Sequence, residues 1–251
     1  MSDVECTEAR LLGGRLLIRQ PARGHRVGTD TMLLAACIAE PGELLVDAGA
    51  GVGAVGLAVS FRAPCAQVRL VERQPELVVI AGENVAANGL SDRVRVLGCD
   101  LLSSASRRGA GLANGSASAL LTNPPFYEQG AVRASPHDAR AQAHVLGEGG
   151  VGAWMRACLA LLAPGGRFAM IHLPQALKPI LEACEGRLGS VRVLPVHARA
   201  GEDAGRIIVT GRKGSRAPLS FAPALVVHEA DGRFTAFVEA VHRGEALLTR
   251  E

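Results

Sequence analysis

Apolar runs of strand length alternate with helical patterns along the chain, from residue 44 to about residue 190. The strand-like runs lie within residues 44–51, 68–74, 94–102, 119–127 and 167–173. Strands that alternate with helices in this way pair in parallel, because each helix carries the chain back across the sheet. The sequence therefore predicts an α/β fold with a mostly parallel sheet.

Two further strand-like segments, 191–198 and 206–213, follow one another without a convincing helix between them. A direct connection of this kind joins antiparallel neighbours, since a parallel pair needs a long crossover. We therefore expect one antiparallel strand near the C-terminal end of the sheet. A further helix is expected within 233–248.

The N-terminal segment has its own pattern. Residues 11–20 predict a short strand pair around Gly13, and residues 31–40 predict an apolar helix that a proline–glycine pair ends. Thr29 or Asp30 is well placed to cap this helix.

No internal repeat and no long linker divides the chain. We expect an N-terminal extension over residues 1–40, followed by one catalytic domain over residues 41–251. The low-complexity stretch 103–118 is predicted to be a loop.

Composition excludes several classes of protein. No charge-free apolar run reaches the length of about 18 residues that a membrane span requires, and the acidic start does not resemble a secretory signal. The six cysteines are at least 26 residues apart, which fits neither a disulfide framework nor a structural zinc site. The seven histidines show no metal-ligand spacing either. We expect a cytoplasmic protein with reduced thiols, no metal and no membrane partner; its oligomeric state cannot be read from the sequence.

Basic residues are unevenly distributed, although the net charge is only +3. Five arginines and no acidic residue lie between residues 10 and 28, namely Arg10, Arg15, Arg19, Arg23 and Arg26. Such a stretch fits a face that contacts phosphates, as RNA binding requires, and it fits a solvated surface hairpin equally well.

A glycine-rich turn follows the first strand of the alternating region. Gly51, Gly53 and Gly56 give the GxGxxG pattern of dinucleotide-binding proteins, which is weak when it stands alone. The second spelling, Asp-x-Gly-x-Gly-x-Gly, starts at Asp47 and includes Gly49. It resembles the first motif of class I S-adenosylmethionine-dependent methyltransferases.

Acidic residues end three successive strands of the predicted sheet: Asp47, Glu72 and Asp100. Both classes of fold place an acid at the end of the second strand, where it holds ribose hydroxyls, and Glu72 fits either one. A carboxylate at Asp47 can face the amino group of a methionine moiety, and Asp100 can accept a hydrogen bond from an adenine amine. Asp47 and Asp100 can also serve only as caps of their own turns.

The segment Asn123-Pro124-Pro125-Phe126 ends the fourth strand, at the carboxyl edge where α/β proteins bind ligands. Successive prolines fix the backbone and leave carbonyl groups exposed as acceptors. The Asn123 amide oxygen and the Pro124 carbonyl can hold the two hydrogens of an exocyclic amine. Phe126 can stack on the ring that bears it, which contributes about 1–3 kcal/mol.

This proline turn after an Asp-x-Gly-x-Gly-x-Gly turn resembles the amino-methyltransferases, which modify adenine N6, guanine N2 or glutamine N5. Two segments narrow the resemblance. Residues 26–35 read RVGTDTMLLA and residues 123–130 read NPPFYEQG, and both are similar to segments of the bacterial valine-tRNA adenine N6-methyltransferase family. The similarity extends from about residue 10 to residue 215. Phe126 stands where that family usually has tyrosine, which keeps the stacking and loses a hydroxyl.

The resemblance implies a Rossmann-like class I methyltransferase fold and S-adenosylmethionine as the methyl donor. It implies catalytic roles for Asn123, Pro124, Pro125 and Phe126. It implies cofactor contacts from Thr29, Asp30, Asp47, Gly49, Gly51, Gly53, Glu72 and Asp100. The expected reaction is methylation of adenine N6 in RNA, with tRNA as the partner. Arg133, Arg140 and His144 are further candidates for contact with the RNA backbone.

Other functions stay open. A protein glutamine N5-methyltransferase would use the same chemistry but usually carries a helical domain before the catalytic one, and only about 40 residues precede the first strand here. A guanine N2-methyltransferase of ribosomal RNA also fits, although the chain lacks the duplication that is frequent there. A nicotinamide-dependent oxidoreductase would explain neither Asp47 nor the proline turn. The non-enzyme alternative is a degenerate cofactor-binding or RNA-binding module.

Overall fold

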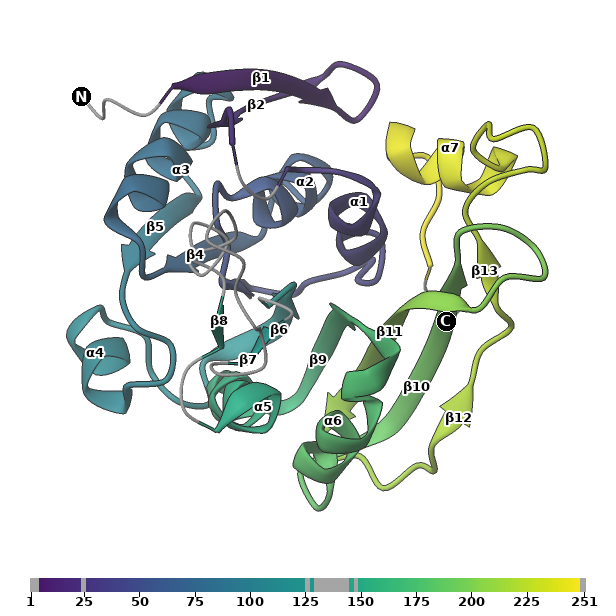
Figure 1. Cartoon of the computed structure of the whole chain (residues 1–251). Coiled ribbons are helices and arrows are strands. Elements are labelled where there is room, and N and C mark those ends of the chain that lie inside the picture. Colours follow the sequence, from purple (N-terminus) through teal and green to yellow (C-terminus); the bar gives the residue numbers. More distant parts are fainter. Residues whose placement is uncertain (1–4, 24–25, 125–126, 129–144, 147–148, 249–251) are drawn as a thin grey trace, which may run out of the picture.

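The computed structural model describes residues 5–23, 26–124, 127–128, 145–146 and 149–248 (Figure 1). Its main sheet runs in the order β12-β10-β11-β9-β6-β3-β4-β5, and β13 also pairs with β10. The strands are β3 (Leu44–Ala48), β4 (Gln67–Glu72), β5 (Val94–Gly98), β6 (Ala117–Thr122), β9 (Leu162–His172), β10 (Leu188–His197), β11 (Ala204–Lys213), β12 (Ser220–Phe221) and β13 (Leu225–Val226). A small parallel pair, β7 (Tyr127–Glu128) and β8 (Val145–Leu146), lies outside this sheet.

The pairing confirms the predicted architecture. β11 is antiparallel to both of its neighbours, β9 and β10, and every other pairing in the main sheet is parallel. The two final long strands are therefore the antiparallel neighbours that their direct connection predicts.

Helices cover both faces of the sheet (Figure 1). They are α1 (Thr29–Ala35), α2 (Ala54–Arg62), α3 (Pro75–Ala87), α4 (Ser104–Gly109), α5 (Gly150–Leu161), α6 (Leu177–Cys184) and α7 (Ala236–Arg243), with a 3-10 turn at Pro174–Ala176. Side chains of a strand point alternately to its two faces, so Ala119 and Leu121 join one apolar layer and Leu120 joins the other. The first layer contains α1, α2, α3 and α7, and the second contains α5 and α6.

An N-terminal hairpin, β1 (Cys6–Leu11) and β2 (Leu16–Pro21), packs over α3. Two asparagines one helical turn apart attach it. Asn88 accepts a hydrogen bond from the Leu17 N–H and donates one to the Leu17 carbonyl, and Asn84 binds both backbone groups of Arg19 in the same way. The two carboxamides therefore pair with β2 as a neighbouring strand would.

The predictions for the first helix were wrong in two respects. The helix ends at Ala35 rather than at residue 40, and the Arg62 guanidinium donates hydrogen bonds to the carbonyls of Ala35 and Ile38 there. Neither Thr29 nor Asp30 caps this helix: Gly28 occupies the N-cap position without a side-chain hydrogen bond.

The stretch 103–118 is not a loop throughout, since it contains α4 and the start of β6. Ser103 caps α4 by accepting from the Ser106 N–H, and the buried Arg107 side chain donates to the Leu101 carbonyl. These local contacts order a sequence whose composition alone is typical of a loop. None of the helices in the described ranges has the length and apolar character needed to cross a membrane.

Candidate active site

The predicted site residues meet at the carboxyl edge of the central strands. Ala48, the last residue of β3, pairs with Val71 on one side and with Thr122 on the other. Glu72 ends β4, and Asn123 directly follows β6. The glycine turn, the Glu72 carboxylate and the start of the proline turn therefore lie on three adjacent strand ends.

Hydrogen bonds to β4 fix the first part of the glycine turn, and the turn has open space in front of Gly51. The N–H groups of Gly49 and Ala50 both donate to the Val71 carbonyl, at 2.9 Å each. Gly51 has a φ of +56°, and a Cβ atom added there would meet no heavy atom of the described residues within 4 Å. A glycine is therefore required by the backbone at this position, and the space in front of it allows a ligand to approach.

Asp47 is buried, with 1% of its surface exposed, and lies beneath this turn. Its Oδ2 accepts a hydrogen bond of 2.8 Å from the Gly56 N–H in the first turn of α2. Burial raises the pKa of Asp47 to about 7, aided by the neighbouring Glu72 and opposed by the bond from Gly56. The Asp47 carboxylate therefore caps the first turn of α2. Because its pKa is about 7, the carboxyl group is only partly ionised at neutral pH.

Glu72 is also largely buried and organises the loop around it. One carboxylate oxygen accepts from the Gly51 N–H at 3.0 Å, and the other accepts from the N–H groups of Arg73 and Gln74. A carboxylate has about four acceptor positions, so these bonds orient Glu72 and leave capacity for ligand hydroxyls.

Asp100 lies one strand further along, after β5, and is exposed. Its Oδ1 accepts from the Leu102 N–H at 3.0 Å, which caps the start of the segment that leads into α4. The structure brings its strand end next to that of Glu72, because the Cys99 N–H donates to the Glu72 carbonyl.

Asn123 is half-buried and Pro124 is buried. Pro125 and Phe126 lie outside the described residues, as do Arg133, Arg140 and His144. Of the four residues to which the sequence assigns catalysis, the structure places the first two, at the edge that also carries the glycine turn.

Sequence analysis missed two residues that support this edge. Thr122 donates a hydrogen bond of 2.8 Å to the Ala48 carbonyl, and the Trp154 Nε1–H donates to the Thr122 hydroxyl at 2.9 Å. The Trp154 ring also closes the turn from the side, since a Cβ atom on Gly49 would lie 2.9 Å from its Cζ2. No pattern connects Thr122 with Trp154 in the sequence, because the contact depends on how α5 packs.

The N-terminal segment reaches the same region through an ion pair. Asp30 Oδ2 lies 2.8 Å from Arg206 Nε on β11. Arg206 is adjacent to Ile207, which pairs with His172, the last residue of β9, so the pair lies at the carboxyl edge. The Asp30 carboxylate therefore joins α1 to the sheet. Thr29 lines a cavity on the side of α1 that faces the hairpin.

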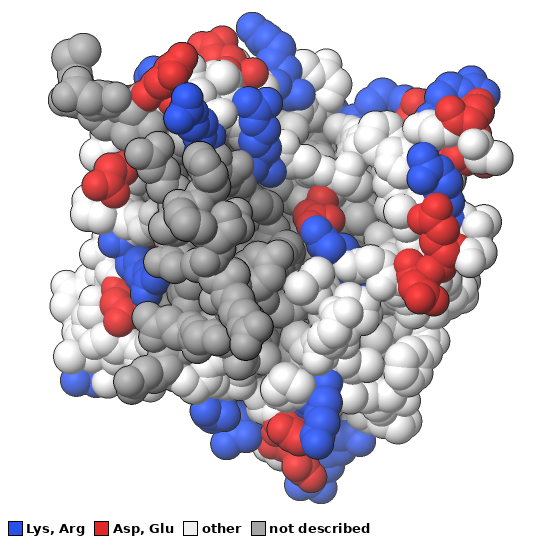
Figure 2. Space-filling model, viewed as in Figure 1, with Lys and Arg blue, Asp and Glu red and all other residues white. Residues whose placement is uncertain are grey.

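The five predicted hairpin arginines do not form one uniform face. Arg15 is used internally, because it donates to the carbonyls of Leu12 and Arg243, and Arg19 pairs with Glu83. Arg10, Arg23 and Arg26 are exposed. Figure 2 shows basic side chains at the top of this face, over the hairpin, with acidic side chains beside them.

The geometry fits a nucleoside cofactor. An open glycine backbone at Gly51 and an adjacent buried carboxylate at Glu72 provide space and acceptors at one strand edge. Within the described ranges, no group of three or more His, Cys, Asp or Glu residues is arranged to hold a metal ion.

A mostly parallel sheet with one antiparallel strand, β11, and a glycine turn after the central strand β3 define a class I methyltransferase. The family model of the methyltransferase small domain matches residues 24–151. The chain belongs to this family.

Known relatives agree with that assignment. The chain is 31% identical over 231 residues to a tRNA1(Val) (adenine(37)-N6)-methyltransferase of Porphyromonas gingivalis, covering 88% of each chain. It is 31% identical over 163 residues to a release factor glutamine methyltransferase of Moorella thermoacetica, covering 61% of this chain and 55% of the relative. Among solved structures, it is similar to a predicted O-methyltransferase of Agrobacterium tumefaciens, with a TM-score of 0.74, 33% identity and coverage of 88% and 99%.

Proposed function

We propose that this S-adenosylmethionine-dependent methyltransferase methylates the N6 amine of an adenine in tRNA. The observation that carries the proposal is the position of Asn123 and Pro124 at the strand edge that also carries the glycine turn and Glu72. An amine acceptor and a cofactor can meet at this edge alone, because parallel sheets of this kind bind ligands outside their carboxyl ends.

In this proposal the cofactor lies over the glycine turn. The methionine end rests on the open backbone at Gly51, and Gly49 and Gly53 form the rest of this turn. Asp47 contributes negative charge from beneath the turn, where it fixes the start of α2. When bound, the sulfonium supplies an electrophilic methyl group and departs as a neutral thioether.

Two acids would hold the nucleoside part. Glu72 is oriented by three backbone N–H groups and accepts hydrogen bonds from the ribose hydroxyls. The exposed Asp100, on the next strand end, accepts from the adenine amine. Thr29 and Asp30 belong to the segment beside this region, and Asp30 acts by fixing α1 to Arg206.

Asn123 and Pro124 would hold the acceptor. The amide oxygen of Asn123 and the Pro124 carbonyl accept the two amine hydrogens, which leaves the nitrogen lone pair directed at the methyl group. Pro125 keeps the turn rigid and Phe126 stacks on the target base. Catalysis then depends on positioning, which is worth up to about 7–11 kcal/mol of the barrier.

The P. gingivalis relative supports RNA as the substrate, because its similarity to this chain extends over 88% of both proteins. A tRNA substrate also places the reaction in the cytoplasm. We further propose that residues 1–40 form an extension to a methyltransferase domain over residues 41–251, with the hairpin held by Asn84 and Asn88.

The second candidate is a protein glutamine N5-methyltransferase. The release factor methyltransferase relative favours it, and the same two acceptors would hold a glutamine amide. The shorter coverage, 55% of that relative, makes it the weaker candidate.

A transfer assay with methyl-labelled S-adenosylmethionine separates the candidates. The protein is offered total RNA that lacks the modification and, separately, a protein extract, and labelled RNA is digested to nucleosides. The proposal predicts label in N6-methyladenosine from the small-RNA fraction. Label in N2-methylguanosine would contradict the target base, and label only in protein would support the glutamine reaction.

A further inference from the structure

A cavity of about 340 Å³ lies between the N-terminal hairpin, α1 and the C-terminal segment. The hairpin turn, residues 10–14, forms one wall, and Gly28, Thr29 and Met32 form the second. Phe234, His242 and Arg243 form the third. The volume lies within the range of about 300–1,000 Å³ that small-molecule sites occupy.

The third wall is an aromatic cluster. Phe234 stacks on His228 with ring centroids 4.7 Å apart, and it contacts His242 edge to face at 4.5 Å. Phe234 and His242 both line the cavity and are partly exposed, so a planar heterocycle can pack against their rings.

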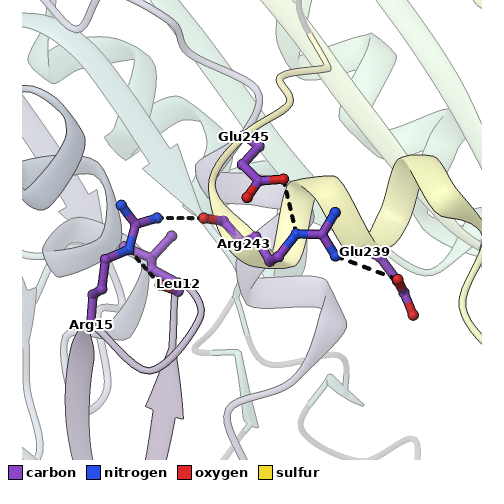
Figure 3. Close-up of polar contacts among 5 residues, drawn as sticks. All are labelled: Leu12, Arg15, Glu239, Arg243 and Glu245. Carbon is purple, nitrogen blue, oxygen red and sulfur yellow. Dashed lines mark hydrogen bonds and ion pairs between the residues drawn. The ribbon is translucent and has the colours of Figure 1, made fainter.

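The charges around the cavity leave one arginine available for an anion. Arg243 is neutralised by Glu239 and Glu245, and Arg15 is used to hold the hairpin turn against the end of α7 (Figure 3). Arg10 is exposed and makes only a long hydrogen bond, 3.4 Å, to the Gly14 carbonyl. Arg10 can therefore bind a phosphate without breaking an ion pair given by the described residues.

The cavity is next to the candidate active site. Thr29 lines it, and the next residue, Asp30, pairs with Arg206 at the carboxyl edge of the sheet. Arg206 lies on β11, and β9 separates β11 from β6, the strand that leads to Asn123. A polymer bound at the candidate active site can therefore reach this cavity.

We propose that this cavity binds one nucleotide of the substrate RNA, close to the nucleotide that is methylated. The base packs against the rings of Phe234 and His242, and the phosphate lies on Arg10. The exposed arginines Arg23 and Arg26 of the same segment extend the basic path along the RNA backbone. The inference rests on the proposed RNA substrate and adds a second contact point that sets its register.

The kinetic test uses two substitutions that leave the strand edge intact. Phe234→Leu keeps an apolar side chain and removes the ring, and Arg10→Ala removes the cation. Each should raise KM for RNA about 10-fold, because one stacked base or one phosphate contact is lost, with kcat and the Kd for S-adenosylmethionine unchanged. Phe234→Tyr should restore the wild-type KM. Arg216→Ala, at an exposed arginine between β11 and β12, is the matched control and should change nothing.

A second arm does not depend on methyl transfer. With the cofactor site saturated by S-adenosylhomocysteine, adenosine 5′-monophosphate is the probe, and its binding is followed by saturation-transfer NMR. We expect a signal in the wild type that both Phe234→Leu and Arg10→Ala reduce. Absence of probe binding, or equal binding in all three proteins, would overturn the proposal. If the wild type methylates no RNA, the proposed function fails, and this arm alone decides whether the cavity binds a nucleotide.

Discussion

The hydroxyl of Thr122 connects the parts of the candidate site at the scale of a single residue. It donates to the Ala48 carbonyl and accepts from the Trp154 indole, so it joins β6, β3 and α5 at the strand edge. Thr122 is fully buried, and Asn123 is the next residue in the chain. The hydrogen bonds of the buried Thr122 hydroxyl therefore help to fix the position of Asn123, the proposed catalytic residue.

Thr122→Val should destabilise the protein by about 1–3 kcal/mol, because the buried Ala48 carbonyl loses its hydrogen bond from the hydroxyl and the half-buried Trp154 N–H loses its acceptor. Thr122→Ser retains the hydroxyl and should lose less than half of that amount. Urea unfolding of the three proteins measures the difference. Equal stability of the Val and wild-type proteins would show that the hydrogen bonds contribute nothing.

The raised pKa of Asp47 predicts that the free energy of unfolding falls as the pH rises. Its native pKa of about 7 is above the ordinary value of 3.8, so the folded state binds the proton more tightly than the unfolded chain does. The contribution of Asp47 to the free energy of unfolding is complete below pH 4 and is lost as the pH rises to about 7. Asp47→Asn cannot ionise and still offers an oxygen to the Gly56 N–H.

Unfolding of the wild type and of Asp47→Asn should be compared between pH 4 and pH 8. The variant should gain stability relative to the wild type by a few kcal/mol as the pH rises to about 7, and the difference should then stay constant. A difference that is independent of pH would show that Asp47 has an ordinary pKa in the folded protein.

At the scale of the element, the hairpin depends on α3 for its position. Asn84 and Asn88 bind alternate residues of β2, and the Asn84 Nδ2 group also donates to the Val52 carbonyl in the glycine turn. Asn84 therefore links the hairpin to the proposed cofactor site, whereas the Asn88 side chain, among the described residues, has hydrogen bonds to the hairpin and to its own helix.

Substitution of the two asparagines should give different results. Asn88→Ala should speed hydrogen exchange at the Leu17 amide and leave the Kd for S-adenosylmethionine unchanged. Asn84→Ala should speed hydrogen exchange at the Arg19 amide. It should also raise the Kd for S-adenosylmethionine several-fold, because the Val52 carbonyl in the glycine turn loses a buried hydrogen-bond donor. Trp154 is the only tryptophan and lies against Gly49, so its fluorescence reports cofactor binding directly. Identical cofactor affinity in both variants would refute the link.

The elements themselves show which local patterns are reliable. Helix α2 begins directly after the glycine turn, as the predicted alternation of strands and helices requires, because the turn and the apolar run are local features. α1 is shorter than predicted, and Arg62, 27 residues further along the chain, binds the carbonyl of its last residue. α4 was not predicted, because the low-complexity composition of its segment hides the Ser103 cap and the bond from Arg107 to the Leu101 carbonyl. A buried arginine in such a role has no periodic signal.

At the scale of the whole molecule, the alternation of strands and helices was sufficient to predict the sheet. It places Asp47, Glu72 and Asn123 at or near the carboxyl ends of their strands, and the strand pairing shows that these three strands are neighbours. The contacts that cross long intervals were not predictable: Asp30 with Arg206, Thr122 with Trp154, and Arg15 with the end of α7. Each depends on the packing of a helix or hairpin whose orientation the sequence pattern does not specify.

The central claim is that the strand edge at Asn123 holds the amine that is methylated. The most direct test compares the wild type with Asn123→Ala. For each protein, kcat is measured for methyl transfer to RNA, and the Kd for S-adenosylmethionine is measured by Trp154 fluorescence on the same preparation. We predict that kcat falls about 100-fold or more, since misplacement of the acceptor by about 1 Å costs that much, while the Kd is unchanged. Full methylation by Asn123→Ala would contradict the account.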